Sequence, residues 1–550
     1  NDFTFTFNAG VGIDESRGTN VMNPYYGQFT TQGGIVSKSH ARSFYINLQQ
    51  LLNYDKTIAG VHHINALVGH EWYKRVTTSL SASKQQLSSL ENKELSGAGI
   101  DGMSAASSKS TYNNEGYFTR VQYDYKNRIF ANASFRRDAS SRFHPKHRWG
   151  NFWSLGAAWL IDQESWFNVP VFSMLKLKAS YGSQGNDNIS NYLYVDTYLG
   201  YPSDNGIGTP FYNKGNENIT WETNANFNFG AEFGLWKDKL TGSVEYFYRK
   251  TTDMLFYFSV PTSNGYGGYY DNIGDMRNGG VEIALNGNII NTTEMRLDIY
   301  ANATHYTNKV LMLPEQNKTV NHEGHWGFEN GSKFVAEGLP VQSFFMPKYA
   351  GVDKETGASL WWKDDENGNR VTTSEYAEAT DYICGDPTPL FYGGFGASFQ
   401  WKGFDIAASF TYSVGGLTYD SGYAAFMSSP TTGGGKNYHK DILKAWSPEN
   451  TGSDIPRWQY GDQYPASQSD RFLVNASYLN FQNAQIGYTF PARITNKMHI
   501  SRIRLFAACD NIWYVSRRVG LDPRQSFSGA TSNAMNSPVR TVSGGLNITF

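Results

Sequence analysis

The chain has 550 residues, a formal net charge of -2 at pH 7 and a mean hydropathy of -0.50. The near-neutral charge excludes a general electrostatic attraction for nucleic acids. No run approaches the ~18 apolar residues of a membrane-spanning helix, which excludes a helical membrane protein but leaves a β-barrel open. Aromatic residues make up 15% of the chain and glycine 55 positions, a composition that favours β-structure with many polar loops.

Alternation of apolar and polar residues predicts about sixteen β-strands, each near the ~10 residues that a tilted strand needs to cross a bilayer. In 240–249, for example, Leu240, Val244 and Tyr246 fall on one face, whereas Thr241 and Glu245 fall on the other. The predicted strands start near residues 2, 41, 59, 115, 128, 150, 175, 219, 239, 279, 294, 389, 403, 472, 502 and 540.

The connections between these strands alternate between short and long. The short ones include "YKNR", "WKDK", "NTTE" and "WKG", and the long ones span about 12–40, 77–114, 183–218, 257–278, 309–388, 415–471 and 515–539. Soluble sandwiches and propellers have no reason to sort loops in this way. Outer-membrane barrels have tight periplasmic turns and long extracellular loops. The sequence therefore predicts an all-β fold, a transmembrane antiparallel β-barrel, over residues 1–550.

One connection is shorter than the other outer loops, and it lies in the basic stretch "FRRDASSRFHPKHRWGNFWS" at 135–154. Taken alone, this stretch is typical of a phosphate-binding surface. In a barrel it forms two strands and a tight extracellular turn. Arg136 and Asp138 then face the lumen and pair with each other, or contact a plug or a ligand. Arg137 faces outward, at a height that suits lipopolysaccharide phosphates. We therefore predict a barrel rim and no nucleic-acid binding.

The long loops are rich in aromatic residues, whose faces stack on sugar rings. As a set they suggest a surface for a substrate or a partner protein. The alternative for each residue is a small hydrophobic core inside a loop. The candidate binding residues are Tyr266, Tyr269, Tyr270, Trp326, Trp361 and Trp362.

No catalytic, metal or cofactor site is predicted. The segment 364–370 places Asp365, Asn367 and Asn369 at alternate positions, like half of a calcium loop, but the required turn glycine and final glutamate are missing. A hairpin turn at Asn367-Gly368 explains it better. The "GGGK" at 433–436 lacks the spacing of a phosphate-binding loop, and no hydrolase or metalloprotease motif is present. Two distant cysteines, Cys384 and Cys509, leave a disulfide open.

Several stretches carry a family resemblance, among them "FRRDASSRFHPKHRWGNFWSLGAAW", "NIGDMRNGGVEIAL" and "SYLNFQNAQIGYTFP", with others at 175–189, 219–255, 384–416 and 445–457. The chain resembles the C-terminal part of a SusC/RagA-type TonB-dependent outer-membrane transporter of Bacteroidota. The resemblance implies a plug domain and a barrel of about 22 strands. This chain has about sixteen predicted strands and no plug, TonB box or signal peptide. We expect a fragment, or a protein whose remaining part is a second chain or is not shown.

The resemblance also implies a function, namely import of large nutrients across the bacterial outer membrane. A SusD-like lipoprotein would cover the extracellular loops, and TonB–ExbB–ExbD would supply energy through the missing N-terminal part. The aromatic loops favour oligosaccharides, with oligopeptides as the alternative. A passive sixteen-stranded porin and a surface adhesin are further alternatives. Family members often carry basic residues where Asn480 and Gln482 stand, so we expect a less positive lumen there.

Overall fold

The computed structural model describes residues 2–99, 102–203, 206–272, 274–430, 437–462, 464–532 and 538–550. The chain forms two compact units. Unit 1 comprises residues 1–158, 180–225 and 251–273, and unit 2 comprises residues 159–179, 226–250 and 274–550. Within the described residues, no helix is long and apolar enough to span a membrane.

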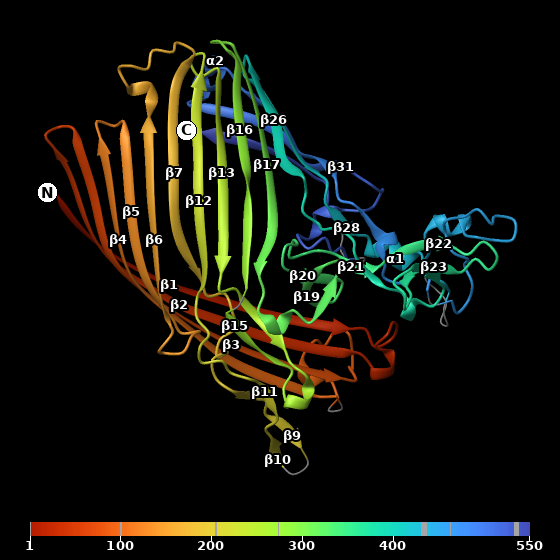
Figure 1. Ribbon diagram of the computed structural model, residues 1–550. Helices are drawn as coiled ribbons and strands as arrows, with labels where there is room; N and C mark the ends of the chain where they lie inside the picture. The colour runs from red at the N-terminus through yellow and green to blue at the C-terminus, as the bar shows by residue number, and fades with distance from the viewer. Residues whose placement is uncertain are drawn as a thin grey trace. The chain divides into compact units, whose positions relative to one another are not determined.

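A large antiparallel sheet dominates the fold, as predicted (Figure 1). Over the described ranges it contains sixteen strands, and each is hydrogen-bonded to the next in chain order. They are β1 (Phe3–Met22), β2 (Ile35–Ile58), β3 (His62–Gln85), β4 (Ser104–Tyr125), β5 (Ile129–Ser140), β6 (Trp149–Leu160), β7 (Phe172–Asn186), β12 (Glu222–Leu235), β13 (Leu240–Thr252), β16 (Asp275–Asn291), β17 (Met295–Met312), β26 (Phe391–Trp401), β27 (Phe404–Val414), β30 (Tyr478–Thr489), β31 (Arg502–Ser516) and β32 (Thr541–Thr549).

Strands β1–β4 of unit 1 are much longer than predicted, with 20 to 24 residues each. The predicted loops 12–40 and 77–114 shrink to 23–34 and 86–103, because both flanking strands continue into them. Their ends are polar, for example "TTSLSASKQ" at 77–85, and therefore lack the apolar alternation that marked the other strands. Backbone pairing continues regardless, since it does not depend on an apolar face.

The strand register sorts side chains cleanly between the two faces of the sheet. In unit 2, the rings of Phe395, Phe410 and Phe481 stack across three strands at centroid separations of 5.0 and 4.4 Å. Trp513 continues this row at 5.8 Å. Between such apolar rows, the alternate residues face the other way and are mostly polar. One apolar and one polar face is the pattern of a transmembrane barrel wall.

Among the described residues, the long loops contain small sheets and the short helix α1, and the short connection between β30 and β31 contains α2. In unit 1 these strands are β8 (Thr197–Tyr198), β9 (Tyr201–Ser203), β10 (Gly206–Gly208), β11 (Phe211–Asn213), β14 (Leu255–Ser259) and β15 (Gly268–Asn272). In unit 2 they are β18 (Val320–His322), β19 (His325–Asn330), β20 (Lys333–Ala336), β21 (Phe345–Pro347), β22 (Tyr349–Val352), β23 (Ser359–Asp364), β24 (Arg370–Thr373), β25 (Asp381–Ile383), β28 (Leu417–Tyr419) and β29 (Leu473–Asn475). The helices are α1 (Ser421–Phe426) and α2 (Ala492–Thr495).

Candidate functional site

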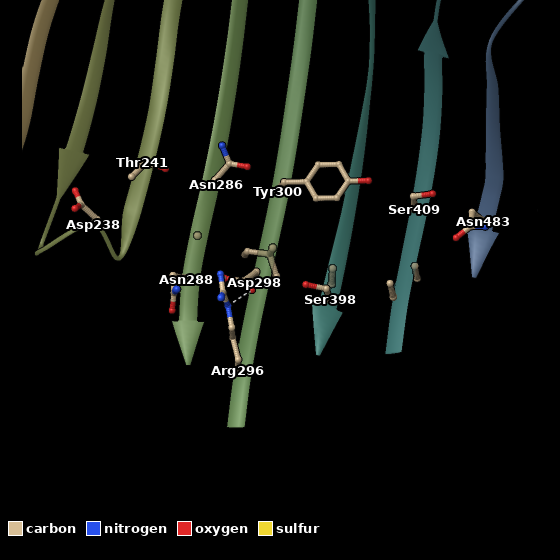
Figure 2. Close-up of a pocket in the computed structure, with 15 residues that line it drawn as sticks. Asp238, Thr241, Asn286, Asn288, Arg296, Asp298, Tyr300, Ser398, Ser409 and Asn483 are labelled. Carbon is tan, nitrogen blue, oxygen red and sulfur yellow. Dashed lines mark hydrogen bonds and ion pairs between the residues drawn. The ribbon is translucent and has the colours of Figure 1, made fainter. Parts of the chain in front are cut away.

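The polar face of unit 2 contains a hollow of about 460 Å³ (Figure 2). Its lining comes from neighbouring strands in register. Asn286 of β16 lies opposite Tyr300 of β17, and Ser409 of β27 lies opposite Asn483 of β30. Asp298 lies between Asn288 and Ser398 in the same way. The period of two along each strand brings these side chains to one face. The sequence analysis did not single them out, because their proximity depends on pairing between distant strands.

Charged groups at this hollow are already satisfied by neighbours. Arg296 Nε donates to Asp298 Oδ2 at 2.6 Å, which Figure 2 shows as a dashed line. Asp238 accepts a hydrogen bond of 2.6 Å from the Ser173 hydroxyl. The other labelled side chains are amides, aliphatic hydroxyls and one phenol. The hollow therefore presents mostly neutral hydrogen-bonding groups, together with the Asp238 carboxylate.

On the same face, a second ion pair joins β27 and β31 across the strand between them, and a glycine on that middle strand leaves room for it. Arg504 of β31 reaches Asp405 of β27 with bonds of 3.0 Å from Nε and 2.6 Å from Nη2. Strand β30 runs between them, and it presents Gly487 at the crossing. A Cβ there would lie 2.6 Å from Arg504 Nη2 and 2.7 Å from the Asp405 carboxylate. Any side chain at this position would separate the bidentate pair.

Arg136 and Asp138 of unit 1 form an ion pair, with 2.8 Å between Arg136 Nε and Asp138 Oδ2. Arg136 Nη2 also contacts Glu71 Oε2 at 3.0 Å. The pair lies over Gly116, where a Cβ would be 2.3 Å from Asp138 Oδ1. Asp138 is 7% exposed. Sequence reasoning named the pair but missed Glu71, because that residue is 65 positions away in the chain.

The six candidate aromatic residues do not form one group. Tyr266, Tyr269 and Tyr270 belong to unit 1, where Tyr269 stacks on Phe258 at 5.5 Å and Tyr270 packs against a buried cluster around Trp221. The three tryptophans belong to unit 2. Trp326 is 54% exposed, whereas Trp361 is 1% exposed and Trp362 is half-buried.

Trp361 belongs to a loop core, the alternative that the sequence left open. Its ring packs edge-on against Tyr376 and Tyr464 at 5.3 and 5.7 Å. Its position excludes direct stacking on a ligand. The alternation in "SLWWKDD" gave a signal for this, since Trp361 follows Ser359 on the inner face of β23. Trp326 is the candidate tryptophan whose ring is most open to solvent.

The acidic segment at 364–370 is a hairpin turn between β23 and β24, as predicted. Asp365 Oδ1 accepts hydrogen bonds of 2.9 and 2.8 Å from the backbone N–H groups of Asn367 and Asn369. In the parts of the chain that the structure describes, no group of three or more His, Cys, Asp or Glu residues is arranged for a metal ion. The segment 433–436 lies outside the described residues. Cys384 and Cys509 are both free thiols.

Two half-buried groups in the unit 2 loops, Lys333 and Cys384, have shifted pKa values. Lys333 Nζ donates to the carbonyls of Gln342 and Ser528 at 2.9 and 2.7 Å and lies 3.2 Å from the centre of the Phe344 ring. Burial lowers the pKa of Lys333 to about 8. Burial also raises the pKa of the Cys384 thiol to about 12. Lys333 thereby joins the loop 309–388 to the loop 515–539, a link that the sequence did not reveal.

Comparison with known proteins gives consistent results. The family model described as "TonB dependent receptor-like, beta-barrel" matches residues 1–387. TonB-dependent receptor P3 of Formosa agariphila is 27% identical over 538 residues, covering 91% of this chain and 52% of that receptor. TonB-dependent receptor SusC of Bacteroides thetaiotaomicron is 28% identical over 438 residues, covering 76% of this chain and 42% of SusC. The chain thus spans about half the length of the curated relatives it matches.

Solved structures agree with this result. The structure of the RagAB peptide transporter is similar with a TM-score of 0.86 and 28% identity, covering all of this chain and 60% of that one. Its open-open state gives the same TM-score and identity. The predicted resemblance to SusC/RagA-type proteins is confirmed. Family members are transporters of the bacterial outer membrane and not enzymes. This chain belongs to the TonB-dependent receptor-like β-barrel family.

Proposed function

We propose that this chain acts in TonB-dependent import of oligosaccharides across the outer membrane. A SusD-like lipoprotein serves as the lid over the long loops, and TonB–ExbB–ExbD supplies the energy. Membership of the family supports active import over a passive porin or an adhesin.

The neutral polar wall of unit 2 is the observation that carries the choice of substrate. Two ion pairs lie within the wall, Arg296–Asp298 and Arg504–Asp405, and Asp238 is hydrogen-bonded to Ser173. The groups that remain for a ligand are amides and hydroxyls, together with the phenol of Tyr300. Such groups match the many hydroxyls of a sugar chain, and they exchange hydrogen bonds with it without burying an unpaired charge.

Import of oligopeptides is the second candidate. It is favoured by the 28% identity and the TM-score of 0.86 to a structure described as a peptide transporter. Amide side chains also pair with peptide groups, so Asn286 and Asn483 suit both ligands. The two candidate ligands differ in charge. Peptides carry ionised ends that need oppositely charged partners in the wall, whereas neutral oligosaccharides do not.

Binding to the full-length protein, purified together with its surface lipoprotein, separates the two candidates. We expect isothermal titration to detect neutral oligosaccharides and no random oligopeptides. Asn286→Ala should weaken binding about tenfold, the order expected for a lost hydrogen bond. Leu285→Ala, a neighbour on the opposite face, is the matched control and should leave the affinity unchanged. Binding of peptides alone would establish the second candidate and refute the first.

A further inference from the structure

The outward face of unit 1 has an upper boundary to its aromatic residues, although Val76 and Leu80 of β3 lie beyond it. This face carries Phe3, Phe5 and Phe7 of β1, which are 56 to 67% exposed. Across β2, β3, β4 and β5, the register places apolar residues beside them, such as Leu52, Val68 and Phe135. In a membrane barrel the apolar face contacts lipid.

A basic residue follows the last outward Phe or Trp on three of these strands. Arg42 lies two residues beyond Phe44 on β2, Lys74 two beyond Trp72 on β3, and Arg137 two beyond Phe135 on β5. In each case the step leads toward the long-loop end of the strand. The boundary crosses the strands diagonally, as expected for strands tilted against a membrane.

Lys109 of β4 extends this group. Register places Thr78 directly between Arg42 and Lys109 on the same face. We call Arg42, Lys74, Lys109 and Arg137 the outward cation row. All four side chains are exposed. Among the described residues, Arg42, Lys74 and Lys109 have no side-chain hydrogen bond or ion pair, and Arg137 lies over the Trp149 ring at 5.1 Å.

Nearby carboxylates are already engaged. Glu15 binds Arg17 at 2.7 Å and His40 at 3.0 Å, and Glu115 accepts a 2.8 Å hydrogen bond from the Tyr117 hydroxyl. Among the described residues, none of the four cations therefore contacts a carboxylate, although Glu15 lies opposite Arg42 in the register. Phosphate groups on lipid heads are the anions available at that height. Arg and Lys bind phosphate through charge-assisted hydrogen bonds.

We propose that the outward cation row binds the phosphorylated sugar head group of an outer-leaflet glycolipid. The acyl chains of that lipid lie along the apolar rows below, and its phosphate contacts Arg42 and Lys74. A second copy of the chain does not fit this face as well. A two-fold contact through it would bring the same cations against each other. The site concerns the lipid side of the wall and does not depend on the transported substrate.

The test uses the full-length protein in nanodiscs of phosphatidylcholine with monophosphoryl lipid A, compared with discs containing the dephosphorylated lipid. Native mass spectrometry measures the lipid that stays bound. Arg42→Gln combined with Lys74→Gln should weaken retention of the phosphorylated lipid roughly thirtyfold, since each cation near a charged membrane surface adds several-fold to binding. Lys74→Gln alone, the milder variant, should reduce it about fivefold.

Arg75→Gln combined with Arg120→Gln is the matched control. It removes the same charge from two adjacent strands, β3 and β4, but both residues lie on the opposite face. This variant should retain lipid as the wild type does. Heat-dependent gel migration shows that each barrel is folded. Equal retention by both double variants would overturn the proposal, as would equal retention of dephosphorylated lipid. Displacement by inorganic phosphate alone, or a change only in oligomeric state, would also overturn it.

Discussion

The long-loop ends of β1–β4 in unit 1 and those of the unit 2 strands are built in different ways. In unit 1, β1–β4 continue as paired strands of 20 to 24 residues, and their loops are short. In unit 2, β16, β17, β26, β27, β30, β31 and β32 have 9 to 18 residues, and the chain between them folds into small sheets. The same chain thus extends its wall by backbone pairing in one part and carries folded loops in another.

The stabilising interactions differ accordingly. The polar ends of β1–β4, here called the ribbon, have small polar pairs across their strands, such as Ser79 Oγ and Ser108 Oγ at 2.7 Å. The unit 2 loops bury large rings, including Phe334, Phe344, Trp361 and Phe472, each with no more than 2% exposure. Burial of apolar area dominates stability where it occurs. Side-chain truncation should therefore matter in the unit 2 loops and hardly at all in the ribbon.

Thiol reactivity gives the largest expected contrast. Because burial raises the pKa of Cys384 to about 12, its alkylation at pH 8 should be roughly a thousandfold slower than that of an exposed thiol. Ser108→Cys places such a thiol on the exposed ribbon. The alkylation rate of each thiol is measured with iodoacetamide in a protein that carries Cys509→Ser. The Ser108→Cys protein also carries Cys384→Ser, so that each protein has a single thiol. Equal alkylation rates of the two thiols would show that Cys384 is as accessible to the reagent as the exposed Ser108→Cys thiol, and would contradict its burial in the unit 2 loops.

Trp361→Ala should destabilise the unit 2 loops by about 3–5 kcal/mol, the usual cost of removing a buried large ring. Hydrogen exchange within 345–383 measures this loss as reduced protection. The control is Trp326→Ala, which removes an exposed ring and should change protection by less than about 0.5 kcal/mol. Similar effects of the two variants would contradict the assignment of Trp361 to a loop core.

Arg136→Ala should lower barrel stability by about 2 kcal/mol, since it leaves the buried Asp138 without its cation. The usual cost of breaking a buried pair is reduced here because Arg136 is partly exposed. Heat-dependent gel migration provides the measurement, and Arg137→Ala, on the other face, is the control. DNA binding should stay at background in all three proteins. A salt-dependent loss of DNA affinity in Arg136→Ala would contradict the barrel-rim interpretation.

Lys333 predicts a smaller, pH-dependent effect in the unit 2 loops. Its pKa is about 8 in the folded loops and 10.5 in its ordinary state, so the unfolded state holds more protons between these values. Loop stability should therefore rise between pH 8 and 10, by about 1 kcal/mol after allowing for partial exposure. Lys333→Met should flatten this rise in a limited-proteolysis assay. If loop stability instead fell between pH 8 and 10, and this fall were absent in Lys333→Met, the predicted direction of the pH dependence would be wrong.

Ser79→Ala combined with Ser108→Ala should give the smallest effect, within about 0.5 kcal/mol, because this exposed pair exchanges readily for water. Thermal unfolding of the wild type and the variant gives the comparison. A loss above about 2 kcal/mol would show that side chains hold the ribbon together after all.

The alternation along the sequence was enough to predict the number of strands and most of their starts. Phe404 and Arg502, for instance, begin strands where the pattern predicted them. The extensions of β1–β4 were missed, because a polar strand end looks like a loop when its partner is unknown. The hairpin at Asn367-Gly368 was predicted correctly, since its turn chemistry is local.

The candidate site depended more on contacts between distant segments. Arg136 and Asp138 are two residues apart, so their pairing was foreseeable from strand geometry. Glu71, the crossing of Arg504 over Gly487 and the link from Lys333 to Ser528 all join segments far apart in the chain. A single sequence carries no signal for such contacts. It likewise could not distinguish the buried Trp361 from the exposed Trp326.

Uptake by cells tests the central claim most directly. A fluorescent neutral oligosaccharide that binds the purified protein is supplied to cells with the intact gene, without the gene, and without TonB. The account predicts accumulation only in the first strain, while uptake of labelled oligopeptides through this protein stays at background. Continued uptake without TonB would contradict active import and indicate a porin. TonB-dependent uptake of peptides in place of oligosaccharides would contradict the proposed substrate.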